Sequence, residues 1–159
     1  MKIKTIHQEL KLYPFEELEQ YDQDLIRQAV DFLDLSYAPY SNFNVATALL
    51  LENGEIIAGA NQENASYPSG LCAERVAVFQ AGAKYPGVAI KSIAITAKSK
   101  THLVKKPAAP CGNCRQAISE YEFKQNSPIE LLLMGEKGEI IKCRSLADIL
   151  PLGFNSSYL

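Results

Sequence analysis

The chain has 159 residues, of which 47% are hydrophobic, and its formal net charge is -2 at pH 7. This length and apolar content suit one compact domain whose core is stable without disulfides, so we expect a single domain over residues 1–159. A protein with this slightly acidic net charge lacks the broad positive surface potential that binding a nucleic-acid backbone requires. We therefore expect a small-molecule substrate and no nucleic-acid partner.

No stretch of the sequence has the character of a targeting or membrane segment. Charges interrupt residues 1–13 every few positions, unlike a secretory or transit peptide, and no apolar run approaches membrane-spanning length. We therefore expect a cytoplasmic protein without membrane association. Because thiols stay reduced in that compartment, the four cysteines are interpreted as metal ligands or free thiols rather than as disulfides.

The first predicted element is a long amphipathic helix. From Pro14 to Ser36, apolar residues recur at three- and four-residue intervals among acids and amides, which places them on one face of a helix. Pro39 ends this pattern. The preceding residues, 3–13, alternate weakly between apolar and polar and would add an edge strand to a sheet.

The remaining predicted elements describe a mixed α/β domain. In chain order they are a strand at 44–51, a two-residue hairpin turn at Asn53–Gly54, a return strand at 55–59, a polar loop at 61–70, a helix at 72–83, a strand at 90–97, a lysine-bearing loop at 99–110, a helix at 111–121, a strand at 129–134, a turn at 135–138 and a strand at 139–143. Strands that alternate with helices after an opening hairpin predict a three-layer α/β/α domain with a mixed sheet of about five strands.

Two cysteine segments carry residues suited to metal chemistry. They are Cys72-Ala73-Glu74-Arg75 and Pro110-Cys111-Gly112-Asn113-Cys114-Arg115, and each stands where a loop enters a predicted helix. Cys111 and Cys114, three apart at a helix start, project together and can share one ion with Cys72. Three thiolate ligands leave the fourth tetrahedral position of a Zn²⁺ ion to water, which is the arrangement of catalytic rather than structural zinc.

The residues beside the cysteines fit this interpretation. Three thiolates around one zinc dication leave a negative site, so the helix N-termini together with Arg75 and Arg115 are expected to offset that charge. Glu74 is interpreted as the catalytic proton carrier. A carboxylate beside activated water can take its proton and deliver protons to a substrate ring nitrogen and a departing amine.

These motifs are similar to those of the cytidine deaminase family, in particular its small homotetrameric zinc-dependent members, whose first ligand is also a cysteine. The resemblance runs from about residue 25 to Phe154 and leaves residues 1–20 as an extension outside it. Three further segments carry it. They are Ala38-Pro39-Tyr40-Ser41-Asn42-Phe43, Asn61-Gln62-Glu63-Asn64-Ala65, and Ile149-Leu150-Pro151 followed by Phe154.

The resemblance implies a cytidine deaminase-like fold, one zinc ion per subunit, and hydrolytic deamination of cytidine and 2′-deoxycytidine in pyrimidine salvage. It implies that Phe43 packs against the cytosine ring and that Asn61 and Glu63 hydrogen-bond the ribose hydroxyls. It also implies a homotetramer in which residues matching Ala65, Tyr67 and Phe154 reach a neighbouring subunit's nucleoside. The substrate-binding residues implied in this way are Phe43, Asn61, Glu63, Ala65, Tyr67, Ala73 and Phe154.

Two other functions stay open on the sequence alone. Blasticidin S deaminase shares the zinc motifs, although Glu63 argues against that substrate if its carboxylate holds ribose. A non-catalytic zinc-stabilised binding module would need a fourth protein ligand, such as Cys143 or His102. Cys143 lies in a predicted strand and is expected to be a buried, inert thiol. The lysines of the 99–110 loop are interpreted as a solvated surface, because no aromatic residues alternate with them.

Overall fold

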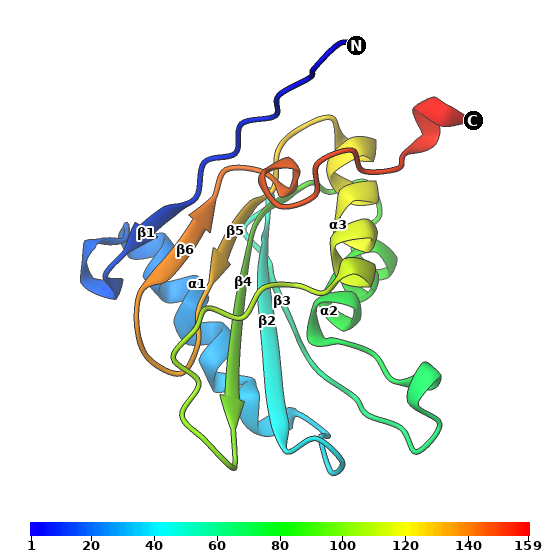
Figure 1. Cartoon of the computed structure of the whole chain (residues 1–159). Helices are drawn as coiled ribbons and strands as arrows, with labels where there is room; N and C mark the ends of the chain where they lie inside the picture. Colours follow the sequence, from blue (N-terminus) through cyan, green and yellow to red (C-terminus); the bar gives the residue numbers. More distant parts are fainter.

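The computed structural model describes the whole chain, residues 1–159, around one six-stranded sheet with helices on both faces (Figure 1). The strand order across the sheet is β1-β6-β5-β4-β2-β3. The strands are β1 (Lys11–Tyr13), β2 (Phe43–Leu51), β3 (Ile56–Ala60), β4 (Ile90–Ser99), β5 (Glu130–Leu133) and β6 (Ile140–Cys143). Only β4 and β5 are parallel neighbours, so the predicted mixed sheet is confirmed, with the edge strand β1 as its sixth member.

Three helices form the two outer layers. They are α1 (Gln20–Asp31) on one face, and α2 (Ala73–Lys84) and α3 (Gly112–Gln125) on the other. Because successive strand residues point to opposite faces, Ile93 packs with the α2 and α3 side while its neighbour Ala94 packs with α1. The predicted three-layer α/β/α architecture is confirmed. None of the helices combines the length and the apolar character needed to cross a lipid bilayer.

The helical region at 14–36 is divided into three pieces, so the prediction of one continuous helix was wrong at both ends. Short 3₁₀ turns at Phe15–Glu17 and Leu33–Leu35 flank α1. Between the first turn and α1, Leu18 and Glu19 adopt ψ angles near 150°, which interrupts the helical path. This break lets Leu18 reach the core beneath α1, and burial of that side chain outweighs the local helical pattern.

The turn between β2 and β3 is one residue longer than predicted. The N–H of Gly54 donates to the carbonyl of Leu51 (3.0 Å) and the N–H of Leu51 donates to the carbonyl of Glu55 (2.9 Å), so the loop is Glu52–Gly54. Among the residues of this loop, only Gly54 has a positive φ, of 86°. A two-residue type I′ turn needs positive φ at Asn53 as well, whereas a type I turn followed by a glycine bulge needs it only at the last position.

A buried ion pair joins α1 to the edge of the sheet. β1 pairs with β6, where Lys11 lies opposite Lys142. The Lys142 ammonium is 2.7 Å from the fully buried Asp22 carboxylate and 3.3 Å from Glu130. The partners come from α1, β5 and β6, so this charge cluster fixes the helix on the sheet beside the N-terminal extension.

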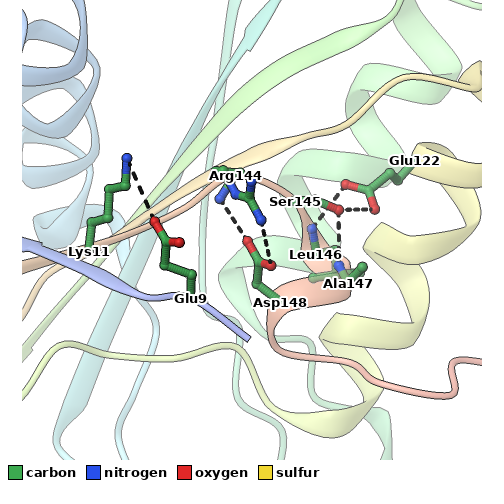
Figure 2. Close-up of polar contacts among 8 residues, drawn as sticks. All are labelled: Glu9, Lys11, Glu122, Arg144, Ser145, Leu146, Ala147 and Asp148. Atoms are coloured by element: carbon green, nitrogen blue, oxygen red, sulfur yellow. Dashed lines mark hydrogen bonds and ion pairs between the residues drawn. The ribbon is translucent and has the colours of Figure 1, made fainter. Parts of the chain in front are cut away.

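The segment after β6 is held against α3 by Glu122, whose contacts with it are visible in Figure 2. The Ser145 hydroxyl donates to Glu122 Oε1 (2.7 Å), and the N–H of Leu146 donates to Oε2 (3.0 Å). Oε2 also accepts from the N–H of Ile129, immediately before β5 (2.7 Å). One carboxylate therefore joins α3, β5 and the C-terminal segment.

Candidate metal centre and active site

Three cysteine sulfurs meet at the N-terminal ends of α2 and α3. Cys72 is the N-cap residue of α2, Cys111 is the N-cap residue of α3, and Cys114 lies in the first turn of α3. Their Sγ atoms all lie within 4.8 Å of one another, with 3.9 Å between Cys72 and Cys111 and 3.5 Å between Cys111 and Cys114. Tetrahedral zinc with Zn–S bonds of about 2.3 Å separates its sulfurs by about 3.8 Å, so this donor set fits one zinc ion.

No fourth protein ligand joins the cluster. Cys143 is buried in the core against α2 and α3 and does not belong to the group. His102 directs Nδ1 at the hydroxyls of Ser99 and Thr101, at 3.1 Å each. The protein thus supplies three of the four ligands of tetrahedral zinc, and a closed structural site is not formed.

Arg75 provides the positive charge beside the sulfurs. Its Nη2 lies 3.9 Å from Cys72 Sγ and 3.5 Å from the carbonyl of Gly70. A hydrogen bond from Cys114 is the largest cause that lowers the pKa of Cys72, to about 5, and Arg75 adds to the effect. The same hydrogen bond raises the pKa of Cys114. Zinc binding removes the remaining thiol protons, since only the thiolate is a ligand.

Arg115, which was also expected to offset the charge of the site, makes hydrogen bonds to backbone carbonyls. Its Nε donates to the carbonyl of Pro110 (2.8 Å) and its Nη1 to the carbonyl of Ile149 (2.6 Å). None of its hydrogen bonds reaches a cysteine sulfur. Arg115 therefore joins the loop before Cys111 to the C-terminal segment, and the direct contact with a ligand sulfur comes from Arg75.

Glu74 lies in the first turn of α2, where it is 4% exposed and lines a cavity beside the cysteines. Its Oε2 is buried without a hydrogen-bond partner. Burial is the main cause that raises the pKa of Glu74, and the charge of Cys72 raises it further. A buried carboxylate with an unpaired oxygen, beside a metal-ligand cluster, is suited to take up and release a proton.

The cavity has a volume of about 580 Å³, within the range of small-molecule sites. Cys72, Cys111 and Glu74 form part of its wall. Four of the predicted substrate-binding residues also line it, namely Phe43, Asn61, Glu63 and Tyr67. The structure thus brings two of the three predicted metal ligands, the predicted proton carrier and four of the seven predicted binding residues to one cavity, with the third ligand, Cys114, buried beside it.

The polar residues of the cavity wall are fixed by backbone groups. Asn61 accepts a hydrogen bond from the N–H of Val45 (2.9 Å) and donates to the carbonyl of Phe43 (3.0 Å). Glu63 Oε2 accepts from the N–H groups of Tyr40 (2.9 Å) and Ser41 (3.2 Å). Hydrogen bonding by Ser41, the largest cause, holds the pKa of Glu63 below its ordinary value. Both backbone hydrogen bonds reach Oε2, which leaves Oε1 of Glu63 without a backbone donor.

The other three predicted substrate-binding residues lie outside this cavity. Ala65 is exposed and Ala73 is fully buried at the start of α2, and neither lines the cavity. Phe154 is 55% exposed, stacks on Tyr158 with ring centroids 5.4 Å apart, and accepts a hydrogen bond from Gln116 through its carbonyl. That Ala65 and Phe154 serve a neighbouring subunit stays a prediction.

Several wall residues were not predicted. Tyr40 and Ser41 line the cavity, and Tyr40 lies beside Tyr67 with ring centroids 5.8 Å apart. Both belong to the segment that ends at Phe43, so the motif itself was a signal for them. Ala108 and Ala109 also line the cavity, from the loop after β4, and nothing in the sequence distinguishes them from ordinary loop residues.

The fold and this site define a zinc-dependent hydrolytic enzyme of the α/β class. The family described as cytidine and deoxycytidylate deaminase zinc-binding region matches residues 19–127, and the chain belongs to that family. Its metal cofactor is accordingly Zn²⁺, in agreement with the three-thiol donor set. The matched region begins just before α1 and excludes β1.

Individual relatives cover most of the chain. A protein of Halalkalibacterium halodurans named cytidine deaminase is 43% identical over 134 residues, which are 84% of this chain and 94% of that protein. A cytidine deaminase of Sporosarcina psychrophila is 36% identical over 138 residues, 86% of this chain and 93% of that protein. The crystal structure of a Burkholderia pseudomallei cytidine deaminase superposes with a TM-score of 0.72 at 36% identity, covering 86% of this chain and 100% of that chain.

Proposed function

We propose that the protein hydrolyses cytidine and 2′-deoxycytidine to uridine and 2′-deoxyuridine with release of ammonia. One observation carries the proposal. Three thiols lie within 4.8 Å of one another, and two of them, Cys72 and Cys111, line a cavity together with a buried carboxylate that has an unpaired oxygen. Relatives of 36% and 43% identity that are named cytidine deaminase support the choice of substrate.

Cys72, Cys111 and Cys114 would hold one zinc ion per subunit. When bound, the ion supplies a Lewis acid that makes water nucleophilic near neutral pH. The N-terminal ends of α2 and α3, which carry these residues, contribute positive partial charge that stabilises the thiolates. Arg75 adds a full positive charge 3.9 Å from Cys72 Sγ.

Glu74 moves the protons of the reaction. Its carboxylate takes a proton from the water that attacks C4 of the base and passes it to ring nitrogen N3, so that C4 becomes tetrahedral. The second hydroxyl proton then goes through Glu74 to the amine, the C–N bond breaks, and ammonia leaves. Cytidine and water thus become uridine and ammonia, and Glu74 returns to its starting state.

Phe43, Asn61 and Glu63 would bind the nucleoside. Phe43 packs against the pyrimidine ring, while Asn61 and Glu63 hydrogen-bond the ribose hydroxyls. The Oε1 atom of Glu63, which has no backbone donor, supports this assignment, because Oε2 is already bound by two backbone N–H groups that orient the carboxylate. A carboxylate placed to accept from a sugar hydroxyl disfavours blasticidin S as the substrate.

The assembly we propose is a homotetramer with shared active sites in the cytoplasm, acting in pyrimidine salvage without nucleic-acid or membrane partners. Residues 1–159 form one domain, in which the extension 1–20 contributes β1. The exposure of Phe154 at 55%, away from its own subunit's cavity, supports its assignment to a neighbouring subunit's site. Light scattering of the purified protein tests the tetramer directly.

The decisive experiment is incubation of the purified, zinc-loaded protein with cytidine while its ultraviolet absorbance is followed. We expect loss of the cytidine band and stoichiometric ammonia, with turnover of 2′-deoxycytidine as well. Parallel incubation with blasticidin S tests the alternative substrate. An unchanged cytidine spectrum with a full complement of zinc would reject the proposed function.

A further inference from the structure

The loop between β4 and α3, residues 100–111, lines the active-site cavity at its far end and contacts a residue of the cavity wall at its near end. At its far end, Ala108, Ala109 and Cys111 line the cavity. At its near end, the His102 ring lies against the ring of Phe43, with centroids 6.5 Å apart and planes inclined by 24°. This near-parallel arrangement lies within the separations of attractive aromatic pairs.

The His102 ring is itself anchored to the sheet. Its Nδ1 is 3.1 Å from both the Ser99 hydroxyl and the Thr101 hydroxyl, and these hydroxyls are 3.0 Å from each other. Ser99 is 8% exposed and pairs directly with Phe43 across the β2–β4 ladder. The imidazole is therefore held by Ser99, which is the residue paired with Phe43 on the neighbouring strand.

The Phe43 backbone is also fixed, which leaves its ring torsions as the remaining freedom. Its N–H donates to the Ser41 hydroxyl (3.0 Å) and its carbonyl accepts from Asn61 (3.0 Å). His102 is the aromatic side chain that stacks on Phe43, and it is not part of the cavity wall. A partner that restricts the ring without entering the cavity can act on binding through Phe43 alone.

We infer that His102 is a positioning residue that holds the Phe43 ring in the orientation that receives the pyrimidine base. The inference rests on the proposed function, in which Phe43 packs against that base. Holding a side chain in its bound orientation reduces the entropy lost on binding, so the effect falls on substrate and product affinity. The reacting C4 atom and Glu74 are not involved, so the effect on kcat is small.

The test compares His102→Ala, which removes the ring, with His102→Phe, which keeps a ring and removes the Nδ1 contacts. KM and kcat for cytidine are measured with the zinc-loaded enzyme, and the Kd of uridine is measured by calorimetry. We expect His102→Ala to raise KM and Kd about two- to tenfold, with kcat within about twofold of the wild type. His102→Phe should keep KM and Kd within about twofold of the wild type.

His7→Ala is the matched control, because His7 is the only other histidine and lies in the N-terminal extension. Thermal unfolding checks that each variant is folded. Unchanged KM and Kd in His102→Ala would overturn the inference. Equal increases of KM and Kd in His102→Ala and His102→Phe would also overturn it, because they would assign the effect to the loop rather than to the ring. A wild-type protein inactive on cytidine would instead reject the proposed function, and this inference with it.

Discussion

Replacing Glu74 with Gln tests the proton-carrier role without disturbing the packing beside the zinc ligands. The two side chains have nearly the same shape, and Glu74 Oε2 makes no protein hydrogen bond that the substitution could break. Glu74 is also the only buried carboxylate in the cavity wall. Glu63 is the only other carboxylate in that wall, and its backbone contacts and lowered pKa keep it from acting as a proton donor.

The expected loss follows from the number of proton transfers that Glu74 makes. One positioned acid–base group contributes about 10²- to 10⁴-fold to a rate. The same carboxylate serves both the attack of water and the departure of ammonia, so we expect kcat to fall at least about 10³-fold, or about 4 kcal/mol of barrier. KM should change much less than kcat, because the contacts proposed for base and ribose remain.

The assay measures cytidine turnover together with the zinc content of the same sample. Glu120→Gln on the exposed side of α3 is the matched control, since it makes the same chemical change outside the cavity and should leave turnover unchanged. A Glu74→Gln protein that retains a tenth or more of wild-type kcat with one zinc ion per subunit would refute the assigned role.

Three further substitutions test the scaffold and the binding site. Asp22→Ala removes the buried partner of Lys142 (2.7 Å) and should lower stability by about 3 kcal/mol, seen as a fall in Tm of about 6–12 °C. Glu122→Gln removes one of the acceptor oxygens that hold the C-terminal segment and should cost about 1–3 kcal/mol in urea unfolding. Glu63→Gln should raise KM for cytidine more than it lowers kcat. The pKa of Glu63 in the folded protein lies below its ordinary value of 4.5. Its contribution to substrate binding is therefore present above pH 4.5 and is lost as the pH falls through the lowered pKa. The KM of the wild-type enzyme should accordingly rise only in acid.

The clustering of the three cysteines could be predicted from the sequence because much of its geometry is local. Cys111 and Cys114 are three residues apart at a helix start, which fixes their relative direction whatever the rest of the chain does. Cys72 and Glu74 likewise share the first turn of α2, with Cys72 at the extended N-cap position. The fold class follows from alternating strands and helices, a pattern that tertiary contacts rarely override.

The contacts between distant segments could not be predicted, because periodicity says nothing about which loop faces which. Glu63 binds backbone N–H groups more than twenty residues earlier, and Arg115 binds the carbonyl of Ile149 thirty-four residues later. The adjacency of Arg115 to Cys114 indicated a residue that offsets the charge of the site, but its hydrogen bonds to the carbonyls of Pro110 and Ile149 had no signal in the sequence. His102 was considered only as a possible fourth metal ligand, because nothing in the sequence indicates that this residue of the loop after β4 lies beside Phe43 on β2.

The order Cys72-Ala73-Glu74-Arg75 places the proposed ligand, the proposed proton carrier and a compensating cation within one helical turn, and their charges are coupled. Cys72 raises the pKa of Glu74, whereas Arg75 lowers the pKa of both Glu74 and Cys72. Three thiolates and an ionised Glu74 exceed the charge of zinc plus Arg75 by one negative unit, which the partial charges at the N-terminal ends of α2 and α3 offset. Taking the proton of water would neutralise Glu74 and leave the negative charge on hydroxide, so the charge would move within the site while its total stayed the same. The charge of Cys72 favours the protonated form of Glu74 and that of Arg75 favours the ionised form, so these two neighbours act in opposite directions on how readily Glu74 would return the proton to the leaving amine.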